Sequence, residues 1–468
     1  ALLFLAPSGS IYSTPEHQHE VQHFFLLSEV RMSQQWSSRI GHILAAAGSA
    51  IGIGAIWKFP YVSATNGGGA FLIVFLVFSF TLGLAVFMAE TLLGSHTREG
   101  VVKAFKQLAG RHWGWVGVLG VTCSWCIFSF YSVVGGWTVG YTFMAAAGKL
   151  NITDSSQLNS LFTDFISNPF LPVITHLLFA ALTCYVVLGG VQRGVEKAVK
   201  IMMPLLFLIM LVLIVVGMTL PGSSAGLKLF LYPDFSHMSG KSVLDALGLA
   251  FFSLSIGLGI HVTYGAYLPD SKGIARSSVW VVTLSCLVCV LAGLMIFPAL
   301  SSAGLDPAAG PGLTFMTMPV FFAHLPGGAV LAVAFFLLLL VAALSSSISL
   351  LENIVAFTQG RWGWSRRNAS LIITASIMLA GIPVTLSFGE LSGFTLGGKT
   401  LFDVLDFLTS NLMMPLFGII ICLVFGWSPR AATLMPTDIS PFWRASLRIT
   451  WRYIGPLFIG VILVRGLM

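Results

Sequence analysis

Charged residues are scarce in this chain: Asp, Glu, Lys and Arg make up only 9% of its 468 residues. A soluble protein carries about a quarter, so the scarcity excludes an ordinary soluble domain. The sequence is 56% hydrophobic, in long apolar runs typical of transmembrane helices. We therefore predict an all-α integral membrane protein. The net charge of +7 comes from basic residues spread over short loops, so it does not predict nucleic-acid binding.

Cysteine is also scarce, and six cysteines give no disulfide framework. Two CxxC pairs, Cys123 with Cys126 and Cys286 with Cys289, lie in apolar runs without a nearby histidine. This context favours packing over zinc or redox chemistry. No cluster of nucleophile, base and orienting residue suggests an enzyme.

The first thirty or so residues differ from the rest of the chain. They are polar and rich in histidine after a short apolar start that is too short to span a membrane. We expect residues 1–31 to be a disordered or non-native extension, with the native start at Met32. Residues 32–468 are expected to form a single domain.

Eleven apolar spans follow, at about 42–62, 68–94, 115–147, 170–189, 195–219, 243–268, 278–302, 327–359, 369–388, 401–426 and 447–466. Lysine and arginine gather in the loops of one side, and the other side holds only Lys149, Lys228, Lys241 and Lys399. Because cytoplasmic loops are the basic ones, the N-terminus is predicted to be cytoplasmic.

The most informative feature is a glycine pattern that occurs twice inside apolar spans. AIGIG at 50–54 is echoed by SIGLG at 255–259. Each glycine costs a helix roughly 1 kcal/mol against alanine, so both spans are predicted to be broken. Two matched breaks indicate a transporter of two inverted repeats with its site at the membrane midplane. We place the repeats at about 40–220 and 243–426, with 447–466 as a peripheral helix.

A broken helix exposes amide N–H groups that attract anions and carbonyls that attract cations. An amino acid, with its carboxylate and ammonium, suits such a site. The alternative is that the glycines only allow close helix packing. Ser345 and Ser346 add hydroxyls within another apolar span, which suit a sodium ion, although serines there can also bond to their own helix.

Several isolated residues permit two interpretations each. Lys58 and Asp406 either close an outer gate or are separate charges at the membrane surface. Asp245 either is a solvated acid at a helix end or supplies a buried negative charge beside a sodium ion. Gly194 and Pro204 either let the start of their span unwind or only kink it.

The stretch WSSRIGHILAAAGSAIGIGAIWKFPY from Trp36, followed by NGGGAF at 66–71, resembles the neurotransmitter:sodium symporter family, which has the LeuT fold. The resemblance covers Trp36 to about Arg465 and is greatest to bacterial eleven-span transporters of hydrophobic amino acids. It implies a sodium-coupled symporter that imports hydrophobic or aromatic L-amino acids by alternating access. It also implies a multi-pass protein of a bacterial inner membrane, and it does not imply an obligate protein partner.

The resemblance also implies site residues. The second sodium site would use carbonyls of Gly48, Ile51 and Ala342 and hydroxyls of Ser345 and Ser346; the first would use Ala50, Ser253 and Ser285. The substrate site would comprise Ala50, Gly52, Gly54, Ile127, Tyr131, Phe252, Ser253, Ser255, Gly257, Leu258 and Leu350. Tyr131 and Phe252 would form a lid beneath the Lys58–Asp406 gate. Gly194 and Pro204 match the unwinding element of the fifth span.

The chain departs from the family pattern at several ion-binding positions. Many members have asparagine at the positions of Ser49, Ala55 and Ser285, so we expect one or two sodium ions. Cys289 and Leu249 replace polar chloride ligands. We therefore expect no chloride requirement, with Asp245 as the substituting charge.

Two further positions concern specificity, and two others concern the cytoplasmic gate. Gly52 stands where amine transporters carry aspartate, which favours amino acids, and Leu258 in place of an aromatic favours bulky side chains. The usual cytoplasmic gate pair is missing, because Ser33 and Gly360 hold its positions, while Arg39 is kept.

Two alternatives remain open. A proton-coupled amino-acid permease of the same fold is disfavoured by Ser345 and Ser346, because proton-coupled relatives often place a cationic side chain there. A sensor or channel-like protein is disfavoured by the paired gates.

Overall fold

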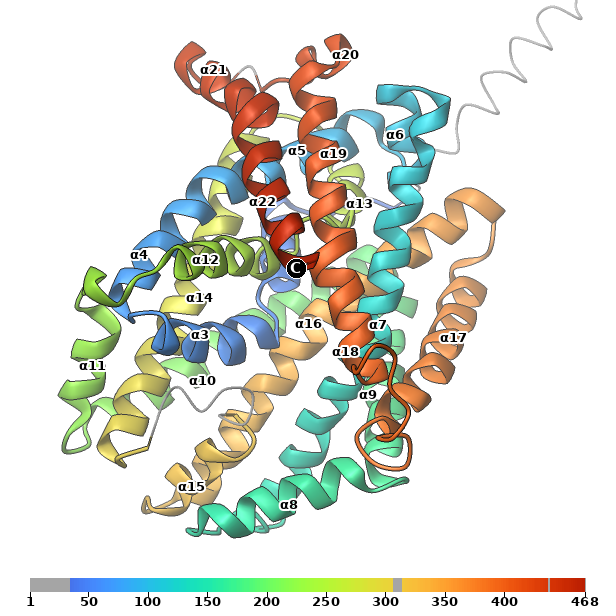
Figure 1. The fold of residues 1–468 in the computed structure, drawn as a ribbon. Coiled ribbons are helices and arrows are strands. Elements are labelled where there is room, and N and C mark those ends of the chain that lie inside the picture. Colours follow the sequence, from blue (N-terminus) through green and yellow to red (C-terminus); the bar gives the residue numbers. More distant parts are fainter. Residues whose placement is uncertain (1–33, 306–313, 437, 468) are drawn as a thin grey trace, which may run out of the picture.

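The computed structural model describes residues 34–305, 314–436 and 438–467, and the predicted extension 1–31 lies outside them. Within these ranges the chain is helical, with two isolated β-bridges and no longer strand. Figure 1 shows long helices running between two ends of the molecule. The predicted all-α architecture is thus confirmed for the described residues.

Nine helices of the described residues are long and apolar enough to cross a membrane: Gly69–Thr97 (α4, η2 and α5), Arg111–Ala146 (η3 and α7), Leu171–Leu188 (α9), Val191–Met218 (η4 and α10), Ile274–Ser302 (α14), Gly328–Trp362 (α16), Arg366–Leu386 (α17), Leu401–Trp427 (α18, η7 and α19) and Pro441–Leu467 (α21, η8 and α22). A tenth span is the pair Arg39–Ala50 (α2) and Gly54–Thr65 (η1 and α3), bent by 54°. The interrupted pair α12 (Gly240–Ser253) and α13 (Ile260–Ala266) corresponds to the sixth predicted span, 243–268, and completes the eleven.

The centre of the molecule is built by α7 and α16, which contact each other extensively, and by α2 and α10, which pack on α16. In Figure 1, α19 and α22 lie side by side over one flank, while α9 and α17 lie beside α7. The short helices α6 (Val101–Ala109), α20 (Pro429–Ala432) and α21 (Pro441–Ile449) gather at one end. This end carries the basic loops and is therefore the cytoplasmic end.

Both predicted breaks occur at the glycine pattern. Helix α2 ends at Ala50, where Ile51 leaves the helical region with φ −87° and ψ 71°. In the second break Gly257 and Gly259 adopt φ of +87° and +75°, a left-handed conformation that disfavours side chains. A Cβ at Gly257 would also lie 2.5 Å from the carbonyl oxygen of Met414. Glycine is therefore required there by backbone conformation and by space.

We predict that Gly257→Ala destabilises the protein, because a left-handed alanine costs roughly 1–2 kcal/mol before any clash with Met414. The measurement is the melting temperature in detergent. Gly248→Ala is the matched control, since it lies inside α12 and a Cβ there meets open space. The control should be neutral or stabilising. An equal melting temperature for both variants would show that the second break tolerates a residue with a Cβ atom at position 257.

Candidate functional site

A cavity of about 50 Å³ lies where the two breaks meet α7 and α16. Its lining residues are Ser49, Ala50, Gly52, Gly54, Ala55, Ile127, Tyr131, Phe252, Ser253, Ser255, Leu258, Ile260, Ser346, Leu350 and Met414. The structure thus brings together ten of the eleven predicted substrate residues. Gly257 is the exception: its backbone faces Met414 of α19 (Met414–Trp427), and its N–H donates to the buried Glu90 carboxylate at 2.7 Å.

Tyr131 on α7 is positioned against the first break. Its hydroxyl accepts a hydrogen bond from the N–H of Ile53, one of the amides that the break leaves free. A Cβ at Gly52 would lie 2.6 Å from the Ser346 hydroxyl and 2.9 Å from the Tyr131 hydroxyl. Only glycine therefore allows both hydroxyls to approach the backbone. An amide, a phenol and a partial positive helix end form a suitable environment for a carboxylate.

Hydroxyls from two other segments bind one carbonyl of the first break. Ser255, in the second break, donates to the carbonyl of Ser49 at 2.8 Å, and Ser346 of α16 donates to the same oxygen at 2.8 Å. Ser255 was predicted to contact the substrate, and in the structure it also joins the two breaks.

The predicted second sodium site is assembled from backbone and hydroxyl oxygens. The hydroxyl of Ser345 donates to the carbonyls of Ile51 (3.2 Å) and Ala342 (2.9 Å), and that of Ser346 reaches the carbonyl of Gly48 at 3.3 Å. These oxygens are buried and uncharged. Such a donor set fits a hard monovalent cation, for which the hydroxyls would turn their lone pairs toward the ion. The ligand assignment itself stays a prediction.

The predicted first sodium site is less complete. Ala50 and Ser253 line the cavity, whereas Ser285 of α14 is buried but is not one of the lining residues. The hydroxyls of Ser253 and Ser285 both bond to carbonyls of their own helices, at 3.3 and 2.9 Å. Of the two sets, only the second has interhelical bonds between its predicted members.

A second cavity of about 820 Å³ opens on the outer side and shares Phe252 and Met414 with the small cavity. These two side chains therefore separate the site from the outside. The ammonium of Lys58 lies 4.9 Å from the centre of the Phe252 ring. Among the described residues, Lys58 and Asp406 do not form an ion pair; Asp406 accepts from the Ser410 hydroxyl at 2.9 Å. The predicted outer gate pair is thus absent from this conformation.

The role predicted for Asp245 gains no support from this conformation and stays a prediction. Its carboxylate pairs with Arg465 of α22 at 3.1 Å and lines the outer cavity. Asp245 lies two helical turns before Ser253, a rise of roughly 12 Å. In this conformation its charge is therefore distant from Ser253 and is paired with a cation.

The cytoplasmic side is closed by a network that the sequence did not predict. Trp36 is buried and its indole donates to the carbonyl of Tyr264 at 2.9 Å. Arg39 forms an ion pair with Asp270. Ser37 donates its N–H to the carboxylate of Glu196 at 2.8 Å. These contacts do not use the usual gate positions: Ser33 lies outside the described residues, and Gly360 has no side chain.

A buried ion pair lies deeper on the same side. Arg366 of α17 binds Glu352 of α16, which is fully buried and also accepts from the Tyr267 hydroxyl at 2.6 Å. Arg366 follows Glu352 by 14 residues but lies on the next helix, and Tyr267 is 85 residues away, so no spacing within one helix identifies these partners. Ile260 and Met414 of the small cavity were also missed, because each reads as an ordinary apolar residue in its span.

The start of the fifth span is wound in this conformation. Gly194 belongs to a π-helical turn, η4 (Val191–Glu196), and Pro204 lies inside α10 (Lys197–Met218). Glu196 at the end of η4 holds Ser37 and Lys200, so the turn is tied to the N-terminal segment. The predicted unwinding requires this tie to break.

The chain is similar to known proteins in sequence and in structure. The model of the sodium:neurotransmitter symporter family matches residues 33–160 and 156–468. An uncharacterized sodium-dependent transporter of Bacillus subtilis is 43% identical over 83% of this chain and 86% of its own length. The sodium- and chloride-dependent GABA transporter 2 of Bos taurus is 27% identical over 82% of this chain and 71% of its own.

The crystal structure of MhsT in complex with L-phenylalanine matches with a TM-score of 0.85 and 38% identity, over 92% of this chain and 99% of that chain. The predicted LeuT fold is therefore confirmed. The fold is that of secondary transporters rather than enzymes.

We predict that Arg366→Ala strongly destabilises the protein. The substitution leaves the Glu352 carboxylate buried without its cation, which costs roughly 3–5 kcal/mol. The melting temperature in detergent checks this. Arg367→Ala is the control: Arg367 is the exposed neighbour, and its loss should change stability by less than about 0.5 kcal/mol. Similar melting temperatures would mean that Glu352 is hydrated when its partner is removed.

Proposed function

Since the chain belongs to the sodium:neurotransmitter symporter family, we propose that it imports hydrophobic L-amino acids with sodium by alternating access. Membership makes it a sodium-dependent symporter of the bacterial inner membrane. One observation supports the proposal most: hydroxyls of Ser345 and Ser346 meet carbonyls of the first break. These are oxygens from two helices at one point, which is what a bound cation can hold together.

The proposed cycle follows from which contacts each ligand strengthens. Sodium between Ile51 and Ser345 joins α2 to α16 and thereby favours the conformation closed to the cytoplasm. A substrate carboxylate at Tyr131 and the Ile53 amide draws Phe252 over the site. Release inward requires separation of Arg39 from Asp270 and of Ser37 from Glu196, which frees the N-terminal end of α2.

The proposed substrate class rests on the walls of the small cavity. Ile127, Leu258, Ile260 and Leu350 are apolar, so they favour an apolar side chain. A cavity of about 50 Å³ holds on the order of four waters. A bulky side chain therefore requires Phe252 or Met414 to move outward. The complex of MhsT contains L-phenylalanine, which supports an amino acid of this class here as well.

We further propose that transport needs no chloride. Cys289 and Leu249 are apolar, buried replacements at the positions where the family resemblance places polar chloride ligands. Because Asp245 pairs with Arg465 in this conformation, this proposal does not depend on a fixed charge from that residue.

We predict that Ser345→Ala/Ser346→Ala weakens sodium activation of transport at least about tenfold, because two ligands of one ion are removed. The measurement is uptake of radiolabelled leucine and tryptophan into proteoliposomes, with an inward sodium gradient against potassium at matched pH. Chloride is replaced by gluconate in a parallel series.

Ser347→Ala is the matched control for that experiment. Ser347 follows the pair on α16, but its hydroxyl bonds to Thr183 of α9 at 2.7 Å, away from the break. It should keep sodium activation. Uptake driven by a pH gradient alone would reject sodium coupling in favour of the permease, and abolition of uptake in gluconate would reject chloride independence.

We predict that Met414→Ala shifts selectivity toward larger substrates, because Met414 borders both cavities and its loss enlarges the small one. The measurement is the ratio of tryptophan to alanine uptake under a sodium gradient, which should rise. Met413→Ala is the control, since Met413 precedes it on the chain and lines neither cavity. An unchanged ratio in Met414→Ala with preserved uptake would show that Phe252 alone limits substrate size.

A further inference from the structure

A third cavity of about 660 Å³ lies at the cytoplasmic end, away from the transport site. We call it the cytoplasmic groove; its lining residues are Leu108, Ala109, Gly110, Trp113, Leu423, Val424, Trp427, Ser428, Pro429 and Arg430. One wall is the end of α6 with the following turn, and the other is the end of α19 with α20. We propose that this groove binds an anionic phospholipid of the cytoplasmic leaflet.

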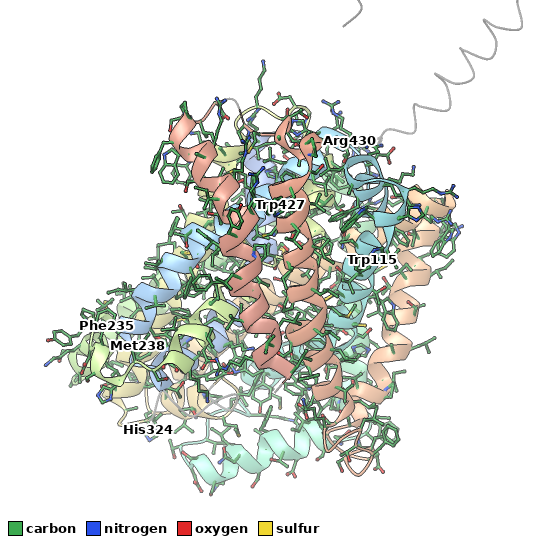
Figure 2. All side chains as sticks on the ribbon, turned by 45° about the horizontal axis from the view of Figure 1, so that its top comes forward. Trp115, Phe235, Met238, His324, Trp427 and Arg430 are labelled. Atoms are coloured by element: carbon green, nitrogen blue, oxygen red, sulfur yellow. The ribbon has the colours of Figure 1, made fainter. Side chains whose placement is uncertain are left out.

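The groove lies at the depth of the lipid headgroups. Its walls stand where two spans meet the membrane surface: Arg111–Ala146 begins at one wall and Leu401–Trp427 ends at the other. Trp113 and Trp427 are 37% and 56% exposed there. Exposed tryptophan is typical of the membrane–water interface. Figure 2 shows Trp427 and Arg430 on the same side of the molecule as Trp115 of α7, a further exposed tryptophan.

The floor of the groove is apolar and its rim is charged, which matches the acyl chains and the headgroup of a phospholipid. Leu108, Val424 and the partly exposed Leu423 make the floor apolar. Arg430 at the rim is exposed, and its described hydrogen bond is a long one, 3.4 Å to the carbonyl of Gln107. Its guanidinium is therefore available for a phosphate.

The charge around the groove is positive. Arg452 lies over the ring of Trp427 at 5.2 Å, and Arg111 begins the short helix η3 (Arg111–Trp113) that ends at Trp113. Among the residues described as lining the groove, Arg430 is charged and none is acidic. A basic pocket between spans on the cytoplasmic side is the arrangement that recognises anionic headgroups. A free anion would leave the apolar floor uncovered, so the lipid is the better occupant.

Both walls of the groove contact the second break of the transport site. In α6, Val101 lies where a Cβ on Gly259 would meet it at 2.8 Å. In α19, the Met414 carbonyl faces Gly257. A lipid that binds α6 and α19 together thus stabilises the conformation in which both contact the break. The bound lipid therefore acts as a regulator of stability and turnover.

The test uses the full chain in detergent with added phosphatidylglycerol or phosphatidylcholine. Bound lipid is counted by native mass spectrometry, and the melting temperature is measured in parallel. Phosphatidylglycerol should be retained preferentially and raise the melting temperature more. Arg430→Gln should weaken its binding about fivefold, the effect of one basic group near an anionic lipid. Trp427→Ala should weaken both effects.

Arg361→Gln is the matched control, because Arg361 is an exposed arginine at the cytoplasmic end of α16 and does not line the groove. It should leave lipid retention unchanged. Equal retention of the two lipids, or an equal loss in Arg361→Gln, would overturn the proposal. A dimer that disappears in Trp427→Ala without a change in lipid retention would assign the groove to a second copy and overturn it too. None of these readouts depends on transport.

Discussion

The structure depends on the requirement that backbone polar groups inside a membrane find partners in the protein. The two breaks free such groups at the midplane, and the surrounding residues bind them. The Ile53 amide is bound by Tyr131, the Ser49 carbonyl by Ser255 and Ser346, and the Gly257 amide by Glu90. In the proposed function, sodium and an amino acid would bind groups of the first break that are paired within the protein here. Stability and transport would then depend on the same atoms.

The sequence predicts the architecture well because membrane proteins have few options. Long apolar runs can only be helices in lipid, and the glycine pattern at 50–54 and 255–259 marks where two of them break. Residues near the breaks, such as Gly52, Tyr131 and Ser346, are brought together as expected. Their roles could be predicted because each residue belongs to a sequence pattern within one short segment.

Side-chain partners on different spans could not be predicted from the sequence. Asp245 reads equally well as a buried counter-charge or a surface acid, and its partner in this conformation, Arg465, lies more than two hundred residues later in the sequence. The ion pair of Glu352 with Arg366 and the ties from Ser37 to Glu196 depend on how spans pack. Conformation adds a further limit: Lys58 contacts Phe252 here, and a sequence does not specify which state of a cycle is observed.

The carbonyl of Ser49 has a consequence for energy conversion. It receives one hydroxyl from α16, the helix of the proposed sodium site, and one from the second break, which lines the proposed substrate cavity. Any ligand that rotates either hydroxyl changes the hydrogen bonding available to the other. By reciprocity, the ion must then alter the affinity for the organic solute by the same factor by which that solute alters the affinity for the ion. One oxygen atom can in this way link the downhill flux of a cation to the uphill flux of a nutrient, and limit leakage of either alone.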